Sequence, residues 1–85
     1  MSIEFLSVRQ VKAARALLAW SQHDMAKASG VSYPTIARLE KSDGNLGGRE
    51  STIAAIRSAL EAAGVEFIAE NGGGAGVRLK KGVTG

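Results

Sequence analysis

A single glycine between two short helical patterns is the feature that most constrains how this chain can fold. The stretch from Trp20 to Ser42 reads WSQHDMAKASGVSYPTIARLEKS. Ser21 followed by Asp24 predicts the capped start of a first short helix, and Gly30 suits the left-handed conformation that often ends one. Two short helices joined by so tight a turn must cross at a steep angle. We therefore expect a small residue at the crossing, which Ala26 supplies.

The helix after this turn is expected to bury one face and expose the others. Ser32 is a typical N-cap, and Pro34 is tolerated in the first turn because the N–H groups there have no intrahelical acceptor. Ile36 and Leu39 recur at helical spacing and are predicted to point inward. The other positions are expected on the remaining faces: Tyr33, Pro34, Ala37, Arg38 and Lys41.

Helical patterns also precede and follow this motif. Ser7 and Gln10 form a capping box, which predicts a helix over residues 8–19. A further pattern predicts a helix over residues 50–63 that stops at Gly64. In both, apolar residues recur at three- and four-residue steps, which predicts one buried stripe on each helix. The stripes are Val11, Ala14, Leu17 and Leu18 in the first, and Ile53, Ile56, Leu60 and Ala63 in the second.

The C-terminal part changes from helical to strand periodicity. VEFIAEN and GVRLKK alternate apolar and charged residues with GGGA between them, which predicts a β-hairpin over residues 65–81. Glu66 and Glu70 on one strand and Arg78 and Lys80 on the other can then face each other with opposite charges. A lone two-stranded ribbon is marginal in water, so the helices or a second chain must cover it, and both remain open. The last few residues are expected to be disordered. We interpret the hairpin as a dimerisation element through Val65, Phe67, Ile68, Val77 and Leu79.

Composition limits the classes of function. The 85 residues suit one domain over 1–85, with no room for a separate ligand-sensing domain. The net charge of +3 and a pI of about 9.7 suit an anionic partner. The absence of cysteine excludes disulfides and cysteine-based zinc sites. Because the sequence shows neither a long apolar run nor a signal-peptide pattern, we expect an intracellular, soluble protein without membrane contact.

Few residues suit catalysis or metal binding. His23 is the only histidine, so no convincing catalytic set or metal cluster can be assembled, and we expect no enzyme activity, metal or cofactor. We expect His23 to face solvent or contact a phosphate, and Trp20 to lie in the core. The glycines at 72–76 lead into a strand rather than a helix, which favours a hairpin turn over a phosphate-binding loop.

The residue types of the opening stretch coincide with a known motif. Positions one, five, nine, fifteen and eighteen of a window that starts at Gln22 are occupied by Gln22, Ala26, Gly30, Ile36 and Leu39. This pattern resembles the helix-turn-helix of the lambda-repressor-like (Cro/cI, or XRE) DNA-binding family, and the resemblance covers about residues 9–64. It implies a mainly α fold, with a DNA-binding bundle of four to five helices over residues 8–64 before the β-hairpin.

The resemblance also implies roles for individual residues. The family's phosphate-positioning residue falls on Gln22, and such a contact sets register rather than sequence. The whole implied DNA-binding set is Gln22, Ser32, Tyr33, Pro34, Thr35, Ala37, Arg38 and Lys41. Within it, Arg38 suits bidentate bonding to guanine, while Tyr33 and Pro34 suit apolar contact with a thymine methyl.

Arg15 and Glu40 match positions that form a partly buried ion pair in family members. The implied function is sequence-specific binding of double-stranded DNA by a repressor of prokaryotic or phage type, a cytoplasmic, nucleoid-associated homodimer. Two alternatives stay open: an antitoxin-type module that binds its own promoter and a toxin, or a domain that binds only proteins. An exposed apolar face on the hairpin would favour the antitoxin, whereas Arg38, Lys41 and Arg49 favour DNA.

Overall fold

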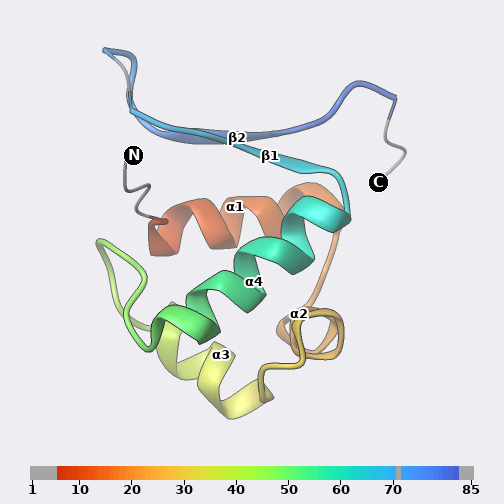
Figure 1. Cartoon of the computed structure of the whole chain (residues 1–85), viewed down its shortest axis with the longest axis vertical. Helices are drawn as coiled ribbons and strands as arrows, with labels where there is room; N and C mark the ends of the chain where they lie inside the picture. Colours follow the sequence, from red (N-terminus) through yellow and green to blue (C-terminus); the bar gives the residue numbers. More distant parts are fainter. Residues whose placement is uncertain (1–5, 71, 83–85) are drawn as a thin grey trace.

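The structure is a computed structural model that describes residues 6–70 and 72–82. They form four helices followed by an antiparallel two-stranded hairpin (Figure 1). The helices are α1 (Val8–Leu18), α2 (Gln22–Ser29), α3 (Tyr33–Glu40) and α4 (Glu50–Ala62), and the strands are β1 (Val65–Ile68) and β2 (Gly76–Leu79). This confirms the mainly helical fold with a C-terminal hairpin. The tail that was expected to be disordered falls on residues 83–85, which lie outside the described residues.

Side-chain caps fix where α1 and α2 begin. The Ser7 hydroxyl accepts a hydrogen bond from the Gln10 backbone N–H at 3.0 Å, and the Ser7 N–H donates to the Gln10 side chain at 2.9 Å. Ser21 and Asp24 form the same reciprocal pair for α2. Both predicted capping boxes are confirmed, and they satisfy N–H groups that a helix leaves without partners. Helix α1 ends before Ala19, one residue earlier than expected, because Ala19 adopts a left-handed φ of 56°.

The elements lie in tiers along the long axis of the molecule. The hairpin crosses one end, α1 and α4 lie beneath it, and α2 and α3 occupy the opposite end (Figure 1). Both α1 and α4 pack against the hairpin, while α2 packs against α3 and α4. The two helices of the motif therefore lie at the end of the molecule far from the hairpin.

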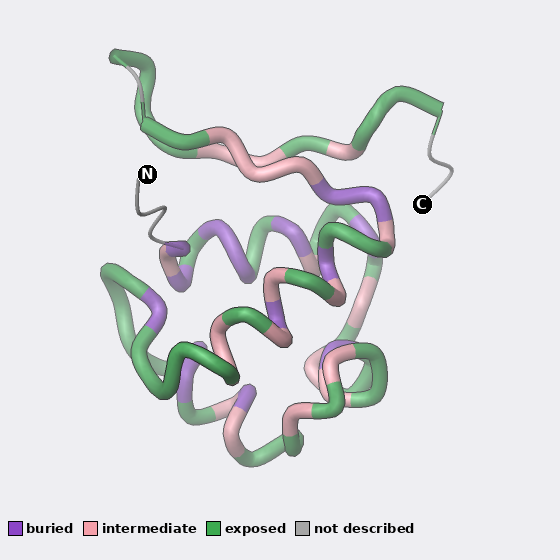
Figure 2. Tube along the Cα trace, in the orientation of Figure 1, coloured by how far each residue is buried: buried purple, intermediate pink, exposed green. Residues whose placement is uncertain are grey.

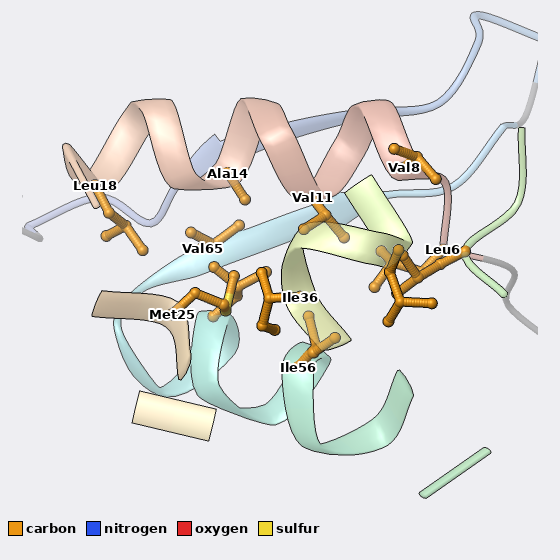
Figure 3. Packing of buried hydrophobic residues seen from close by; sticks show 12 residues of the cluster. Leu6, Val8, Val11, Ala14, Leu18, Met25, Ile36, Ile56 and Val65 are labelled. Atoms are coloured by element: carbon orange, nitrogen blue, oxygen red, sulfur yellow. The ribbon is translucent and has the colours of Figure 1, made fainter. Parts of the chain in front are cut away.

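One apolar core receives side chains from every helix and from β1. Its largest fully buried side chains are Met25, Ile36, Ile56, Leu60, Val8, Val11 and Val65. Figure 3 shows Met25, Ile36 and Ile56 below the α1 side chains Val11 and Ala14. Fully burying an apolar side chain of this size contributes about 1.5–3 kcal/mol relative to leaving it exposed. The core therefore holds α3 in place from its inner side.

The prediction that Leu17 belongs to the buried stripe of α1 is wrong. Leu17 is 40% exposed, whereas its neighbour Leu18 is buried. Successive helical residues point about 100° apart, so a narrow stripe accommodates only one of the two. Leu17 instead shares a face with Gln10, seven residues earlier. The Gln10 amide donates to the Gly76 carbonyl of β2 at 3.1 Å, so this face of α1 is directed toward the hairpin at Gln10.

The hairpin packs against its own chain. Val65 has no exposed surface. The apolar residues on the same face are half-buried against the helical core (Figure 2), namely Phe67, Val77 and Leu79. The Arg57 guanidinium of α4 lies over the Phe67 ring, 5.2 Å from its centroid. The helices α1 and α4 thus cover the apolar face, which the sequence left open between the helices and a second chain.

The opposite face of the hairpin carries charge. Val65 pairs with Leu79 and Glu66 with Arg78 in the register of the two strands. Arg78 Nε lies 2.6 Å from Glu66 Oε1, which agrees with the prediction that opposite charges face each other across the two strands. The hydrogen bond from Arg78 lowers the pKa of Glu66 below its usual range. The outward face of the ribbon is therefore polar near its middle.

Candidate nucleic-acid interface

The turn between α2 and α3 is held by local hydrogen bonds. Gly30 ends α2 with a φ of 76°, and its N–H donates to the Ala26 carbonyl at 2.9 Å. The Ser29 hydroxyl donates to the Met25 carbonyl at 2.7 Å and accepts from the Val31 N–H at 3.1 Å. A positive φ favours glycine because other residues carry a Cβ that is strained there. The predicted role of Gly30 as the end of the first motif helix is confirmed.

Helix α3 begins with its own side-chain cap. The Ser32 hydroxyl accepts from the Thr35 N–H at 3.4 Å and donates to Thr35 Oγ1 at 2.9 Å. Pro34 is the second helical residue, where the missing N–H costs no hydrogen bond. Ser32 and Thr35, both predicted to contact DNA, thus fix each other's side chains at the start of α3.

The faces of α3 follow the sequence prediction. Ile36 and Leu39 are buried, with exposures of 1% and 4%. Of the five residues predicted for the other faces, Ala37 is half-buried and four are exposed, namely Tyr33, Pro34, Arg38 and Lys41. We refer to all five, together with Ser32 and Thr35, as the α3 front. Since the inner side is anchored in the core, the α3 front is available to a partner.

Arg15 and Glu40 join α1 to the last residue of α3. Arg15 Nε donates to Glu40 Oε2 at 2.8 Å and Nη2 to Oε1 at 2.6 Å, while Nη1 donates to the Trp20 carbonyl at 2.9 Å. The Glu40 side chain is only 3% exposed. Burial alone raises the pKa of Glu40, but hydrogen bonds from Arg15 and Gln22 outweigh it, so the pKa lies below its usual range. The pair therefore stays ionised and fixes the end of α3.

Gln22 belongs to the same network, which the sequence did not reveal. Its Nε2 donates to Glu40 Oε1 at 3.1 Å, across 18 residues of sequence. An amide nitrogen carries two hydrogens, so this bond leaves one for a further acceptor. Glu40 thus orients the Gln22 side chain at the start of α2. The phosphate contact predicted for Gln22 stays a prediction.

A contact between His23 and Tyr33 was also missed. The two rings are parallel within 2°, and their centroids are 4.0 Å apart. His23 lies in the first turn of α2 and Tyr33 is the first residue of α3, so the stack bridges the starts of the two motif helices. His23 is exposed, as expected, but its stacking on Tyr33 was not predicted. The only available signal was a pair of ring residues at corresponding places in the two helices.

The loop after α3 carries a compensated acidic charge. Arg9 Nε lies 3.2 Å from Asp43 Oδ1, and the hydrogen bond from Arg9 lowers the pKa of Asp43. Lys41 and Arg49 on either side of this loop are exposed. Among residues 6–70 and 72–82, no group of three or more His, Cys, Asp or Glu side chains is arranged to hold a metal. None of the helices described is both long and apolar enough to span a membrane.

Comparison with protein families agrees with this geometry. A family model described as helix-turn-helix matches residues 11–55, which are 45 of the 85 residues of the chain. The match includes all of α2 and α3 and the turn between them. A comparison with curated proteins gave no match. The matched family consists of DNA-binding regulators and is not typically enzymatic. The chain therefore belongs to the lambda-repressor-like (XRE) family of helix-turn-helix DNA-binding regulators.

Proposed function

We propose that the protein is a transcriptional repressor that binds a pseudo-palindromic operator as a homodimer, with the α3 front in the major groove. The observation that carries this function is an exposed helix front, including Tyr33 and Arg38, on a helix fixed at both ends. Ser32 caps its start, and the Arg15–Glu40 pair fixes its end. A helix held in this way enters a groove without reordering its backbone, which keeps the entropic cost of binding low.

Each side chain of the α3 front, together with Gln22 of α2, has a chemical role in this proposal. The Arg38 guanidinium donates to O6 and N7 of a guanine, and Tyr33 and Pro34 pack against a thymine methyl. Lys41 and Gln22 contact phosphates, which sets the register of the protein on the duplex. The remaining members of the set contact the groove near the start and middle of α3: Ser32, Thr35 and Ala37.

The hairpin offers backbone groups for joining two copies. The Lys80 N–H donates to the Gly64 carbonyl at 2.8 Å, and hydrogen-bonded pairs alternate along an antiparallel ladder. In the observed register, Glu66 and Arg78 then form a hydrogen-bonded pair, and the backbone N–H and C=O of Val77 point away from β1. Within the described part of the chain, no third strand pairs with either outer edge. An open edge of this kind pairs readily with another strand.

We favour β2 as the strand that pairs with its copy. Leu17 is an exposed apolar residue of α1, and α1 is the helix that packs most closely against β2, so α1 offers apolar surface for a partner on this side of the hairpin. Two identical antiparallel strands pair about a two-fold axis, which closes the dimer, and four strands are more stable than two. Of the predicted dimerisation residues, Val77 and Leu79 lie on this strand. Val65 instead serves the core of its own chain, and Phe67 and Ile68 lie on β1.

Edge pairing also points both copies of α3 in the same direction. The helices lie on one face of the hairpin and α3 lies at the far end of the molecule (Figure 1). A two-fold axis normal to the sheet therefore keeps both α3 helices on one side of the dimer. Packing two hairpins face to face would send them to opposite sides. Two half-sites about one helical turn apart, roughly 34–36 Å, require the first arrangement.

The two alternatives have less support. An antitoxin-type module would be expected to expose an apolar face of the hairpin to its toxin. In this chain the apolar face of the hairpin is half-buried against the helical core. A domain that binds only proteins would not explain why Arg38 and Lys41 are exposed on the helix-turn-helix motif of a DNA-binding family.

Selection of bound duplexes from a random library by the full chain tests this function. We expect enrichment of a pseudo-palindrome whose half-sites are centred one helical turn apart, with a guanine in each half-site. Enrichment of a single unrepeated half-site would contradict the homodimer. No enrichment of any sequence would contradict sequence-specific binding.

A further inference from the structure

The stacked pair of His23 and Tyr33 is a contact that the fold does not require. Both residues are exposed, and Tyr33 retains 40% of its surface. Gly30 already fixes the turn between α2 and α3, and Ser21 and Ser32 already cap the two helix starts. Neither ring belongs to the apolar core. The stack therefore arranges the surface of the motif rather than its interior.

An unsupported tyrosine at the start of a helix is free to change its side-chain rotamer. Such a side chain must be ordered when it enters a groove, and this ordering lowers affinity. The His23 imidazole, parallel to the Tyr33 ring at a centroid distance of 4.0 Å, restricts that motion. His23 is itself held on a helical turn that Ser21 and Asp24 cap. The Tyr33 ring is thus presented in one orientation before DNA arrives.

We propose that His23 is a positioning residue that presents the Tyr33 ring to the 5-methyl group of a thymine. This inference rests on the proposed function, because it requires α3 to enter the major groove. The thymine methyl is the apolar group on the groove floor, and an aromatic side chain matches it by contact. Tyr33 touches the base, whereas His23 acts through Tyr33. Pyrimidines that carry a 5-methyl group are the class of base that this pair recognises.

A different role for His23 would be donation of an imidazole N–H to a phosphate near the start of α2. The two roles require different properties of the side chain. Stacking needs a flat ring, and phenylalanine keeps one. Donation needs a ring N–H, which phenylalanine lacks. His23→Phe therefore separates the two roles, and His23→Ala removes both.

The test uses the full chain and the duplex that it selects, with thymidine replaced by deoxyuridine at one position at a time. This exchange removes only the methyl group. Wild-type protein should lose about 4-fold in affinity at one position of each half-site, the effect of burying one methyl group. His23→Ala should bind the unmodified duplex about 3- to 10-fold more weakly and discriminate less against deoxyuridine. His23→Phe should stay within about 2-fold of wild type and keep the discrimination.

Tyr33→Ala completes the test. It should abolish the discrimination against deoxyuridine, and adding His23→Ala to it should change the affinity no further. Losses that add in the double variant would overturn the proposal, as would equal, sequence-independent losses in His23→Phe and His23→Ala. The proposal would also be overturned if the melting temperature of His23→Ala fell so far that partial unfolding alone explained its weaker binding. Failure of the proposed function is distinguishable, because the wild-type chain would then select no duplex.

Discussion

Two ion pairs, one among the helices and one on the hairpin, share the same chemistry but not the same surroundings. Arg15–Glu40 joins α1 to α3, and Arg78–Glu66 joins the two strands, each with a nitrogen–oxygen distance of 2.6 Å. Side-chain exposures are 19% and 3% in the first pair, against 65% and 43% in the second. A buried charge that loses its partner finds no water, whereas an exposed charge does. Distance alone therefore does not measure how much the fold depends on a pair.

The same contrast extends to the two ends of the fold. The motif end is fixed by side chains: caps, a buried charge pair and an amide bonded to it. At the hairpin end, the helices cover the apolar face, but the backbone N–H and C=O groups on the outer edges of the two described strands have no strand to pair with. A fixed surface suits the reading of DNA, and an open edge suits the joining of two copies.

The largest effect is expected from breaking the buried pair. Glu40→Ala leaves Arg15 largely buried without its carboxylate and removes the acceptor of Gln22. We expect the free energy of unfolding to fall by about 3–5 kcal/mol, measured by urea denaturation at neutral pH. A decrease of less than about 1 kcal/mol in the free energy of unfolding, which is typical of surface pairs, would show that burial does not make the stability of the fold more dependent on this pair.

Replacing Arg38, which we propose to read a base, should affect binding and not folding. Arg38→Ala should weaken binding to the selected operator by about 1–3 kcal/mol and relax the preference at the guanine of each half-site. Lys27→Ala is a matched control, since Lys27 is an exposed basic residue outside the α3 front. Titration of labelled duplexes measures both. If Arg38→Ala weakens all duplexes equally, Arg38 contacts a phosphate instead.

A smaller effect is expected from acid. The folded protein holds the pKa of Glu40 below its usual range, with hydrogen bonds from Arg15 and Gln22 outweighing burial. Its contribution to stability is therefore complete above the unfolded pKa, about 4.3, and is lost as pH falls through the lower folded pKa. Urea denaturation from pH 7 to pH 3 should show that the free energy of unfolding falls more steeply with acid in wild type than in Glu40→Gln. Identical slopes of the free energy of unfolding against pH would argue against a lowered pKa of Glu40.

The smallest effect is expected from breaking the exposed pair. Glu66→Ala leaves Arg78 in contact with water, so the unfolding transition should shift by no more than the error of the measurement. Parallel urea curves of wild type, Glu66→Ala and Glu40→Ala compare the two ends directly. Equal losses in the two variants would remove the contrast between the pairs.

Features with partners close in the sequence were predictable. The caps at Ser7, Ser21 and Ser32 bond to groups three residues away, and Gly30 acts through its own backbone. Such signals depend on spacing alone. The mainly helical fold and the alternating hairpin followed from periodicity for the same reason.

Contacts that the tertiary fold creates were harder to predict. Nothing local links Gln22 to Glu40, His23 to Tyr33, or the Gln10 amide to the Gly76 carbonyl. The error at Leu17 has a related cause, because two adjacent leucines both suit the edge of a helical stripe and only packing decides between them. The pairing of Arg15 with Glu40 was implied by family resemblance rather than by spacing.

We propose that the motif end reads DNA and that the β2 edge joins two copies of the chain. The most direct test of this proposal is the binding of Val77→Pro to the full operator and to one half-site. Proline removes the N–H that points away from β1, and the β1–β2 ladder does not use that group. Val77→Ala shortens the same side chain but keeps the N–H, so it is the matched control. We expect Val77→Pro to sediment as a monomer and to bind the full operator no more tightly than a half-site, while Val77→Ala remains dimeric. A Val77→Pro protein that stays dimeric and binds the full operator as tightly as wild type would contradict joining through β2.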